Sequence, residues 1–167
     1  MSFPDLCNKN LRRFYSRVAV QQNRDVGFAA TIRYIFCIMT RVSVGVIQRN
    51  GTILLCQRKQ GSRYGLKWEF PGGKLEPGET PLEGMKRELH EELSIKVNGV
   101  ERMETLTAHY ADGGTFEVAY CFVSDFEGEP RNNVFEQIRW VTREELRTMD
   151  ILEGNKAFVA QLSSPHL

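Results

Sequence analysis

The segment from residue 80 to residue 93 constrains the fold most, because it carries the signals of an amphipathic α-helix. Thr80 is a suitable N-cap, Pro81 occupies the first helical position, and Glu83 is placed to complete a capping box with Thr80. The apolar residues of the segment recur at helical spacing, at Leu82, Met85, Leu89 and Leu93. We therefore expect a helix that packs one apolar stripe on a core and turns its other side away from that core.

Acidic residues gather on that other side of the helix. Glu88, Glu91 and Glu92 are spaced i, i+3 and i+4, so their carboxylates share one face, away from the apolar stripe. Like charges at this spacing repel each other. The pattern is either an ordinary solvated acidic face or a site for a hard divalent cation such as Mg²⁺, which prefers carboxylate oxygens and would remove the repulsion.

Strand and turn signals surround the helix. Residues 41–48 alternate and are rich in β-branched side chains, Asn50-Gly51 is a strong hairpin turn, and residues 52–57 are expected to form the returning strand. Further strands are expected at residues 68–70, from residue 97 onward, and at residues 106–110, 115–123 and 138–141. Turns or loops are expected at residues 60–65, 71–73, 76–79, 112–114 and 126–133.

Two more helices are expected near the end of the chain. Thr142 is a suitable N-cap for a short helix that begins at Arg143, and residues 155–162 are expected to form the last helix. A length of 167 residues suits one domain with a substantial core.

Charge and cysteine usage narrow the class of protein. A formal net charge of +1 gives no global field for holding a nucleic acid polymer, although it leaves a single nucleotide open as a ligand. The cysteines form no Cys-x-x-Cys pair, which excludes a zinc knuckle or redox motif, and reduced thiols in the cytoplasm are expected. They are Cys7, Cys37, Cys56 and Cys121. The apolar stretch 28–39 is interrupted by Arg33 and is too short to span a membrane, so no membrane partner is expected.

The first 38 residues are basic and poor in acidic side chains. Three interpretations are open: an organelle transit peptide, an extra helix packed on the domain, or an extension outside the working domain. We favour the extension, because the first convincing strand follows Met39. The expected organisation is an extension at residues 1–38 and a single catalytic domain at residues 39–167.

The segment 73–95 resembles the Nudix box, G-x5-E-x7-R-E-U-x-E-E-x-G-U, in which U is an aliphatic residue. Every specified position of the box is present except one, since Ser94 stands where the family has glycine. The wider resemblance runs from about residue 41 to residue 162, and the stretch WEFPGGK at residues 68–74 is similar to the MutT-type branch of the family. Glycine after a helix end commonly adopts the left-handed conformation, which Ser94 can adopt at a cost of roughly 1 kcal/mol.

The resemblance implies a fold, a cofactor and a reaction. The fold is of the α/β class, namely the Nudix fold, a mixed β-sheet sandwiched between helices, with a loop–helix–loop that carries the box. The cofactor is Mg²⁺, with Mn²⁺ as a substitute, and the reaction hydrolyses a nucleoside triphosphate to the monophosphate and pyrophosphate. The implied metal ligands are the carboxylates of Glu88, Glu91 and Glu92, with the Gly73 carbonyl as a further ligand. Glu91 or Glu92 would act as the base.

The resemblance also assigns roles outside those ligands. Arg87 would orient carboxylates such as Glu79, the alternative being a surface pair with Glu83 or Glu91. Glu136 is either one more acidic ligand or base, or a solvated loop charge. Arg58 is either a substrate contact or an exposed arginine at a strand end, and Lys74 is a further expected substrate contact.

Asn155 bears on the choice of nucleotide. It resembles the asparagine that reads the base in MutT proteins, although an asparagine before a helix is also a common N-cap. An amide offers one acceptor and a donor group, which match the protonated N7 and the O6 of 8-oxoguanine but not the two acceptors of guanine. The expected substrate is therefore 8-oxo-dGTP. The alternatives are CTP or a modified dCTP, or a non-catalytic Nudix module that only binds a ligand.

Overall fold

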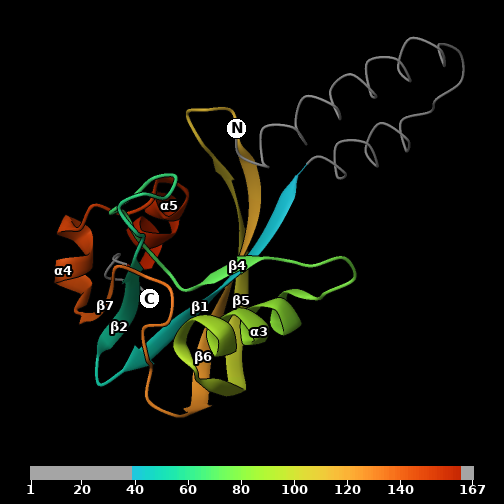
Figure 1. Cartoon of the computed structure of the whole chain (residues 1–167), viewed down its shortest axis with the longest axis vertical. Helices are drawn as coiled ribbons and strands as arrows, with labels where there is room; N and C mark the ends of the chain where they lie inside the picture. Colours follow the sequence, from blue (N-terminus) through green and yellow to red (C-terminus); the bar gives the residue numbers. More distant parts are fainter. Residues whose placement is uncertain (1–38, 163–167) are drawn as a thin grey trace, which may run out of the picture. The chain divides into compact units, whose positions relative to one another are not determined.

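The computed structural model describes residues 39–162 of the chain, so the predicted extension at residues 1–38 lies outside the described residues. The strands are β1 (Thr40–Arg49), β2 (Thr52–Gln57), β3 (Trp68–Glu69), β4 (Gly72–Lys74), β5 (Lys96–His109), β6 (Thr115–Glu127) and β7 (Gln137–Val141). The helices are α3 (Pro81–Leu93), α4 (Arg143–Thr148) and α5 (Glu153–Leu162) (Figure 1). These elements confirm the α/β class and most of the predicted segments.

The sheet is mixed. Its strand order is β3-β2-β1-β6-β5, with β4 also paired to β1 and β7 to β2. The pair of β1 and β6 is parallel, whereas the other pairs are antiparallel. The β1–β2 hairpin turns at Asn50 and Gly51, whose φ angles of 50° and 77° fit a two-residue hairpin turn of the predicted type.

Helices cover both faces of the sheet, as the alternation of β2 illustrates. Leu54 and Cys56 belong to the core cluster that includes the buried face of α3. Ile53 and Leu55 point the other way, into the cluster with residues of α4 and α5. Figure 1 shows α3 well apart from α4 and α5, as this two-sided packing requires. The predicted sandwich of a mixed sheet between helices is confirmed.

Helix α3 begins as the sequence predicts. Thr80 accepts a hydrogen bond from the backbone N–H of Glu83 at 3.3 Å, and the Glu83 carboxylate accepts one from the Thr80 N–H at 2.9 Å. Three of the four predicted stripe residues have no exposed surface, namely Met85, Leu89 and Leu93. The fourth, Leu82, is 42% exposed, and Gly84 is the residue that α3 buries in its first turn instead.

Two further boundaries differ from the predictions. Residues 71–73 were expected to form a turn, but Gly72–Lys74 form β4 and pair with β1. That pairing joins segments about 30 residues apart, so local turn propensity could not reveal it. The loop expected at residues 126–133 begins later, because β6 continues to Glu127.

Candidate active site

The acidic face of α3 lies against the backbone of β4. The Gly72 N–H donates a hydrogen bond of 2.9 Å to Oε2 of Glu92. Next to it, a Cβ atom at Gly73 would lie 2.3 Å from Oε1 of Glu88, so no larger residue fits while that carboxylate keeps its place. Gly72 itself has a φ of 141°, which L-residues rarely adopt. Gly73 therefore leaves room for the Glu88 carboxylate, whereas Gly72 allows the main chain of β1 to approach closely.

Arg87 ties the helix to the loop before it. Its Nε and Nη2 donate to the two oxygens of Glu79 at 2.8 and 3.0 Å, and its Nη1 donates to Glu88 at 2.9 Å. The surface pair with Glu83 is absent from these contacts, and Glu91 lies farther off at 3.7 Å. The hydrogen bonds from Arg87, followed by the one from the Glu76 N–H, lower the pKa of Glu79 to about 2. Arg87 thus holds Glu79 ionised and fixes the position of Glu88.

Glu92 has the most perturbed environment of the cluster. Burial raises its pKa, the Gly72 hydrogen bond opposes this shift, and the nearby charges of Glu88, Glu69 and Glu91 add to it, so that the pKa lies at about 8. The site therefore has more negative charge than its own cations neutralise. A bound cation would offset this excess of negative charge.

The side chains of this cluster can make up only part of the ligand set that Mg²⁺ needs. Glu88 next to Gly73 and Glu92 next to Gly72 could supply hard oxygen ligands, whereas the Glu91 side chain is 57% exposed. Within residues 39–162, no group of three or more His, Cys, Asp or Glu side chains is close enough together to hold a metal by itself. Mg²⁺ characteristically keeps several waters and substrate oxygens as ligands, so two carboxylates and a carbonyl suit it.

Arg58 has a protein partner in this site. Its Nη1 contacts both carboxylate oxygens of Glu69, at 2.8 and 2.9 Å, and its Nε donates to the Arg63 carbonyl at 2.9 Å. Burial raises the pKa of Glu69, and Arg58 acts against that shift. Sequence reasoning missed Glu69. Its position between the buried Trp68 and Phe70 is the signal that could have found it, because a strand turns alternate side chains to opposite faces.

The remaining predicted residues lie around this cluster. Lys74 is exposed on β4, and its carbonyl accepts from Arg87 at 3.2 Å. Glu136 is exposed just before β7, where its N–H donates to the Gln57 carbonyl at 2.9 Å. The structure thus puts Glu136 next to Gln57, the last residue of β2, which directly precedes Arg58 in the sequence. Ser94 ends α3 in the expected left-handed conformation, with φ 56° and ψ 30°.

Asn155 is not the cap of the last helix. Helix α5 begins two residues earlier, at Glu153, so the N-cap interpretation was wrong. The Asn155 side chain is instead buried, with 5% of its surface exposed, and Oδ1 accepts a hydrogen bond of 3.0 Å from the Tyr120 hydroxyl. A buried amide needs such partners, which sequence spacing alone did not reveal.

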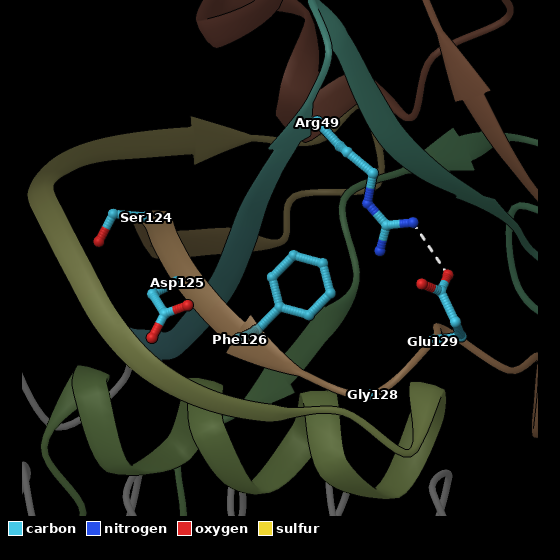
Figure 2. A pocket seen from close by; sticks show the side chains of 6 residues that line it. All are labelled: Arg49, Ser124, Asp125, Phe126, Gly128 and Glu129. Carbon is cyan, nitrogen blue, oxygen red and sulfur yellow. Dashed lines mark hydrogen bonds and ion pairs between the residues drawn. The ribbon is translucent and has the colours of Figure 1, made fainter.

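A surface hollow of about 640 Å³ lies elsewhere, at the end of β6. Figure 2 shows its lining, in which Arg49 points toward Glu129 and lies near the ring of Phe126. The ion pair is 2.9 Å long, and the guanidinium carbon is 5.3 Å from the ring centroid. None of the predicted site residues lines this hollow, so the carboxylate cluster rather than the hollow defines the candidate active site.

Comparison with known families decides the class of this site. The model of the NUDIX domain matches residues 39–162. The chain belongs to the NUDIX domain family. Within residues 39–162, no helix of this Nudix chain is long and apolar enough to cross a membrane.

Relatives of the Nudix chain include three named hydrolases. It is 35% identical to nucleoside triphosphatase NudI of Enterobacter sp. (strain 638), over 70% of this chain and 91% of the relative. It is 31% identical to 8-oxo-dGTP diphosphatase of Escherichia coli, over 73% and 95% of the two chains. It is 34% identical to CTP pyrophosphohydrolase of Escherichia coli, over 64% and 78%.

A solved structure extends the likeness to the whole domain. The solution structure of the Escherichia coli ORF135 protein matches with a TM-score of 0.66 and 27% identity, covering 77% of this chain and 95% of that one. The predicted resemblance to MutT-like Nudix hydrolases is therefore confirmed. This Nudix chain is an enzyme of the pyrophosphohydrolase class.

Proposed function

We propose that this Nudix enzyme uses Mg²⁺ to hydrolyse a nucleoside triphosphate to the monophosphate and pyrophosphate, and that 8-oxo-dGTP is its preferred substrate. The observation that carries the first part is the convergence of Glu88 and Glu92 on the main chain of Gly72 and Gly73. Relatives named for 8-oxo-dGTP and CTP hydrolysis support the substrate class. Removal of 8-oxo-dGTP would keep a mispairing nucleotide out of DNA.

The residues of the chain divide the work of this reaction. Glu88, Glu92 and the Gly73 carbonyl would hold the metal, with Glu91 at the exposed edge of the cluster. When bound, Mg²⁺ neutralises phosphate charge and lowers the pKa of coordinated water. Arg87 keeps Glu79 and Glu88 in place, so that the charged oxygens are ordered before the substrate arrives.

Proton removal falls to a carboxylate of the same helix. Glu92 is placed for this role beside the Gly72 N–H, and a bound cation would lower its raised pKa so that the carboxylate is ionised and able to accept a proton. Glu91 is the alternative, because its exposed carboxylate can pass a proton directly to solvent. In either case the carboxylate oxygen accepts the proton of the attacking water while the phosphate is held by charge.

The preference for the oxidised base rests on Asn155. Its buried amide can pair with the N7–H and O6 of 8-oxoguanine, whereas guanine would set an acceptor against the amide oxygen. Mismatches of this kind inside a site discriminate by roughly 10⁴-fold or more. A second candidate is a CTP-type substrate, which the CTP pyrophosphohydrolase relative favours.

The test of the substrate is a panel of nucleotides. We expect kcat/KM for 8-oxo-dGTP to exceed that for dGTP, CTP and modified dCTP, and Asn155→Ala to abolish the preference for 8-oxo-dGTP over dGTP. A higher kcat/KM for CTP in the unmodified enzyme would favour the pyrimidine alternative. Equal values for 8-oxo-dGTP and dGTP would contradict the proposed substrate.

A further inference from the structure

The Tyr120 side chain of β6 lies directly against the Asn155 amide of α5. Its hydroxyl donates to Oδ1 of Asn155 at 3.0 Å and is 3.2 Å from the Gly154 carbonyl oxygen. Tyr120 has no exposed surface, and the contact joins residues 35 positions apart. A buried hydroxyl aimed at a buried amide is therefore built into the packing between the sheet and the last helix.

Aromatic rings hold this tyrosine still. The ring of Phe158 stacks on Tyr120 with centroids 3.7 Å apart and planes 12° apart. On another side, Phe70 meets Tyr120 edge to face at 5.9 Å, and Phe70 also contacts Phe158 at 5.5 Å. The ring is enclosed by two neighbours that also contact each other, so its hydroxyl keeps one position.

The fixed hydroxyl limits what Asn155 can present to a ligand. A side-chain amide has two acceptor lone pairs on its oxygen and two N–H donors on its nitrogen. Tyr120 takes up one lone pair, which leaves one acceptor and the donor group for a base edge. Burial also raises the pKa of Tyr120 above its usual value, so the hydroxyl stays protonated and able to donate.

We infer that Tyr120 is a positioning residue for base selection, because its hydroxyl orients the Asn155 amide that reads the base edge. The inference rests on the proposed function, in which Asn155 contacts the base. Without the hydroxyl, the amide can rotate and exchange its donor and acceptor positions. Tyr120 would thus act on the choice between nucleotides and not on the phosphates.

The experiment measures kcat/KM for 8-oxo-dGTP and for dGTP in the full-length enzyme and in Tyr120→Phe. We expect the ratio of the two values to fall about three- to tenfold, as the loss of one hydrogen bond predicts, through a higher KM for the preferred nucleotide. Tyr64→Phe is the matched control. Its hydroxyl contacts Asp112 and not Asn155, so its ratio should equal that of the unmodified enzyme. A purely structural defect would lower both kcat/KM values equally and leave the ratio unchanged.

A double-mutant cycle tests whether Tyr120 acts through Asn155. The double variant Tyr120→Phe/Asn155→Ala should have the same ratio of kcat/KM values as Asn155→Ala alone. Thermal unfolding establishes that each variant is folded at the assay temperature. If Tyr120→Phe is not, Phe158→Leu keeps the hydroxyl but removes the stacked ring and should lower the ratio in the same direction.

The outcomes separate this inference from the proposed substrate. If the unmodified enzyme prefers another nucleotide, the proposed substrate is wrong. The ratio is then kcat/KM for the preferred nucleotide divided by kcat/KM for dGTP. A fall of that ratio in Tyr120→Phe still supports the inference. A folded Tyr120→Phe enzyme that keeps the full ratio overturns the inference. An equal fall of the ratio on adding Tyr120→Phe to the unmodified enzyme and to Asn155→Ala also overturns it.

Discussion

The three carboxylates on the acidic face of α3 differ in environment although four positions separate the first from the last. Glu88 is held by Arg87, Glu92 is partly buried against Gly72, and Glu91 is mostly exposed. Their helical spacing was predictable from the sequence, because periodicity fixes which side of a helix a residue occupies. Their unequal burial was not, since it depends on β4, which pairs with β1 from a distant part of the chain.

Neutralising Glu92 should remove most of the activity. Glu92→Gln keeps an oxygen for the Gly72 hydrogen bond but loses the charge that binds Mg²⁺ and the base function. We expect kcat to fall by about 10²-fold or more, with Glu91→Gln also reducing turnover strongly. Steady-state kinetics with saturating Mg²⁺ gives the result. Glu144→Gln in α4, an exposed glutamate of another helix, is the control and should have the normal rate.

Glu92 should also make the metal-free protein less stable as the pH rises. The folded protein keeps a proton on Glu92 up to about pH 8, whereas the unfolded chain releases it above its ordinary pKa of 4.5. Between these values the folded state binds more protons, so the free energy of unfolding falls with rising pH. In EDTA, Glu92→Gln should therefore be more stable than the unmodified protein at pH 8 and about equal at pH 5.

Chemical denaturation at several pH values measures this difference. Adding Mg²⁺ should raise the stability of the unmodified protein most at high pH, where Glu92 releases its proton readily, and should have little effect on Glu92→Gln. Parallel stability curves for the two metal-free proteins would show that Glu92 titrates normally.

At the scale of elements, α3 and the loop before it form one unit. The start of the helix was predictable because the Thr80 and Glu83 capping box is local in sequence. The strand at β4 was not, because glycine and proline there signal a turn while the observed structure comes from pairing with β1. The same reason explains the misplaced start of α5, where packing against Tyr120 outweighs the capping preference of Asn155.

The ion pair between Arg87 and Glu79 should make the stability of the fold depend on pH in the acid range. The pKa of Glu79 is lowered to about 2, so its ion pair stabilises the fold above the ordinary pKa of 4.5 and is lost as the pH falls toward 2. At pH 6, Glu79→Gln should thus unfold at a lower temperature than the unmodified protein. Between pH 5 and pH 2.5, its unfolding temperature should fall less than that of the unmodified protein. Glu76→Gln, a neighbouring exposed glutamate, serves as the control. An acid response of Glu79→Gln equal to that of the unmodified protein would contradict the role of the pair.

At the scale of the whole molecule, the recognisable domain begins where the described residues begin. The NUDIX domain match starts at residue 39, and β1 starts at Thr40. The core clusters described above are formed by residues 42–162. The interpretation of residues 1–38 as an extension outside the working domain therefore stays a prediction.

Removal of that extension is a direct test. A chain that starts at Met39 should be soluble, unfold cooperatively and keep kcat within about twofold, because it retains the core clusters and the carboxylate cluster of the described residues. Circular dichroism melting and the nucleotide assay measure both properties on the short and full-length chains. Loss of folded, active protein on truncation would assign residues 1–38 to the fold.

The most direct test of the central claim is the identity of the products. The full-length enzyme is incubated with 8-oxo-dGTP and Mg²⁺, and the products are separated by anion-exchange chromatography, with Glu92→Gln and an EDTA-treated sample alongside. We predict equal amounts of the nucleoside monophosphate and pyrophosphate from the unmodified enzyme, and almost none from the two controls. Release of diphosphate and inorganic phosphate, or turnover undiminished in EDTA, would contradict the account.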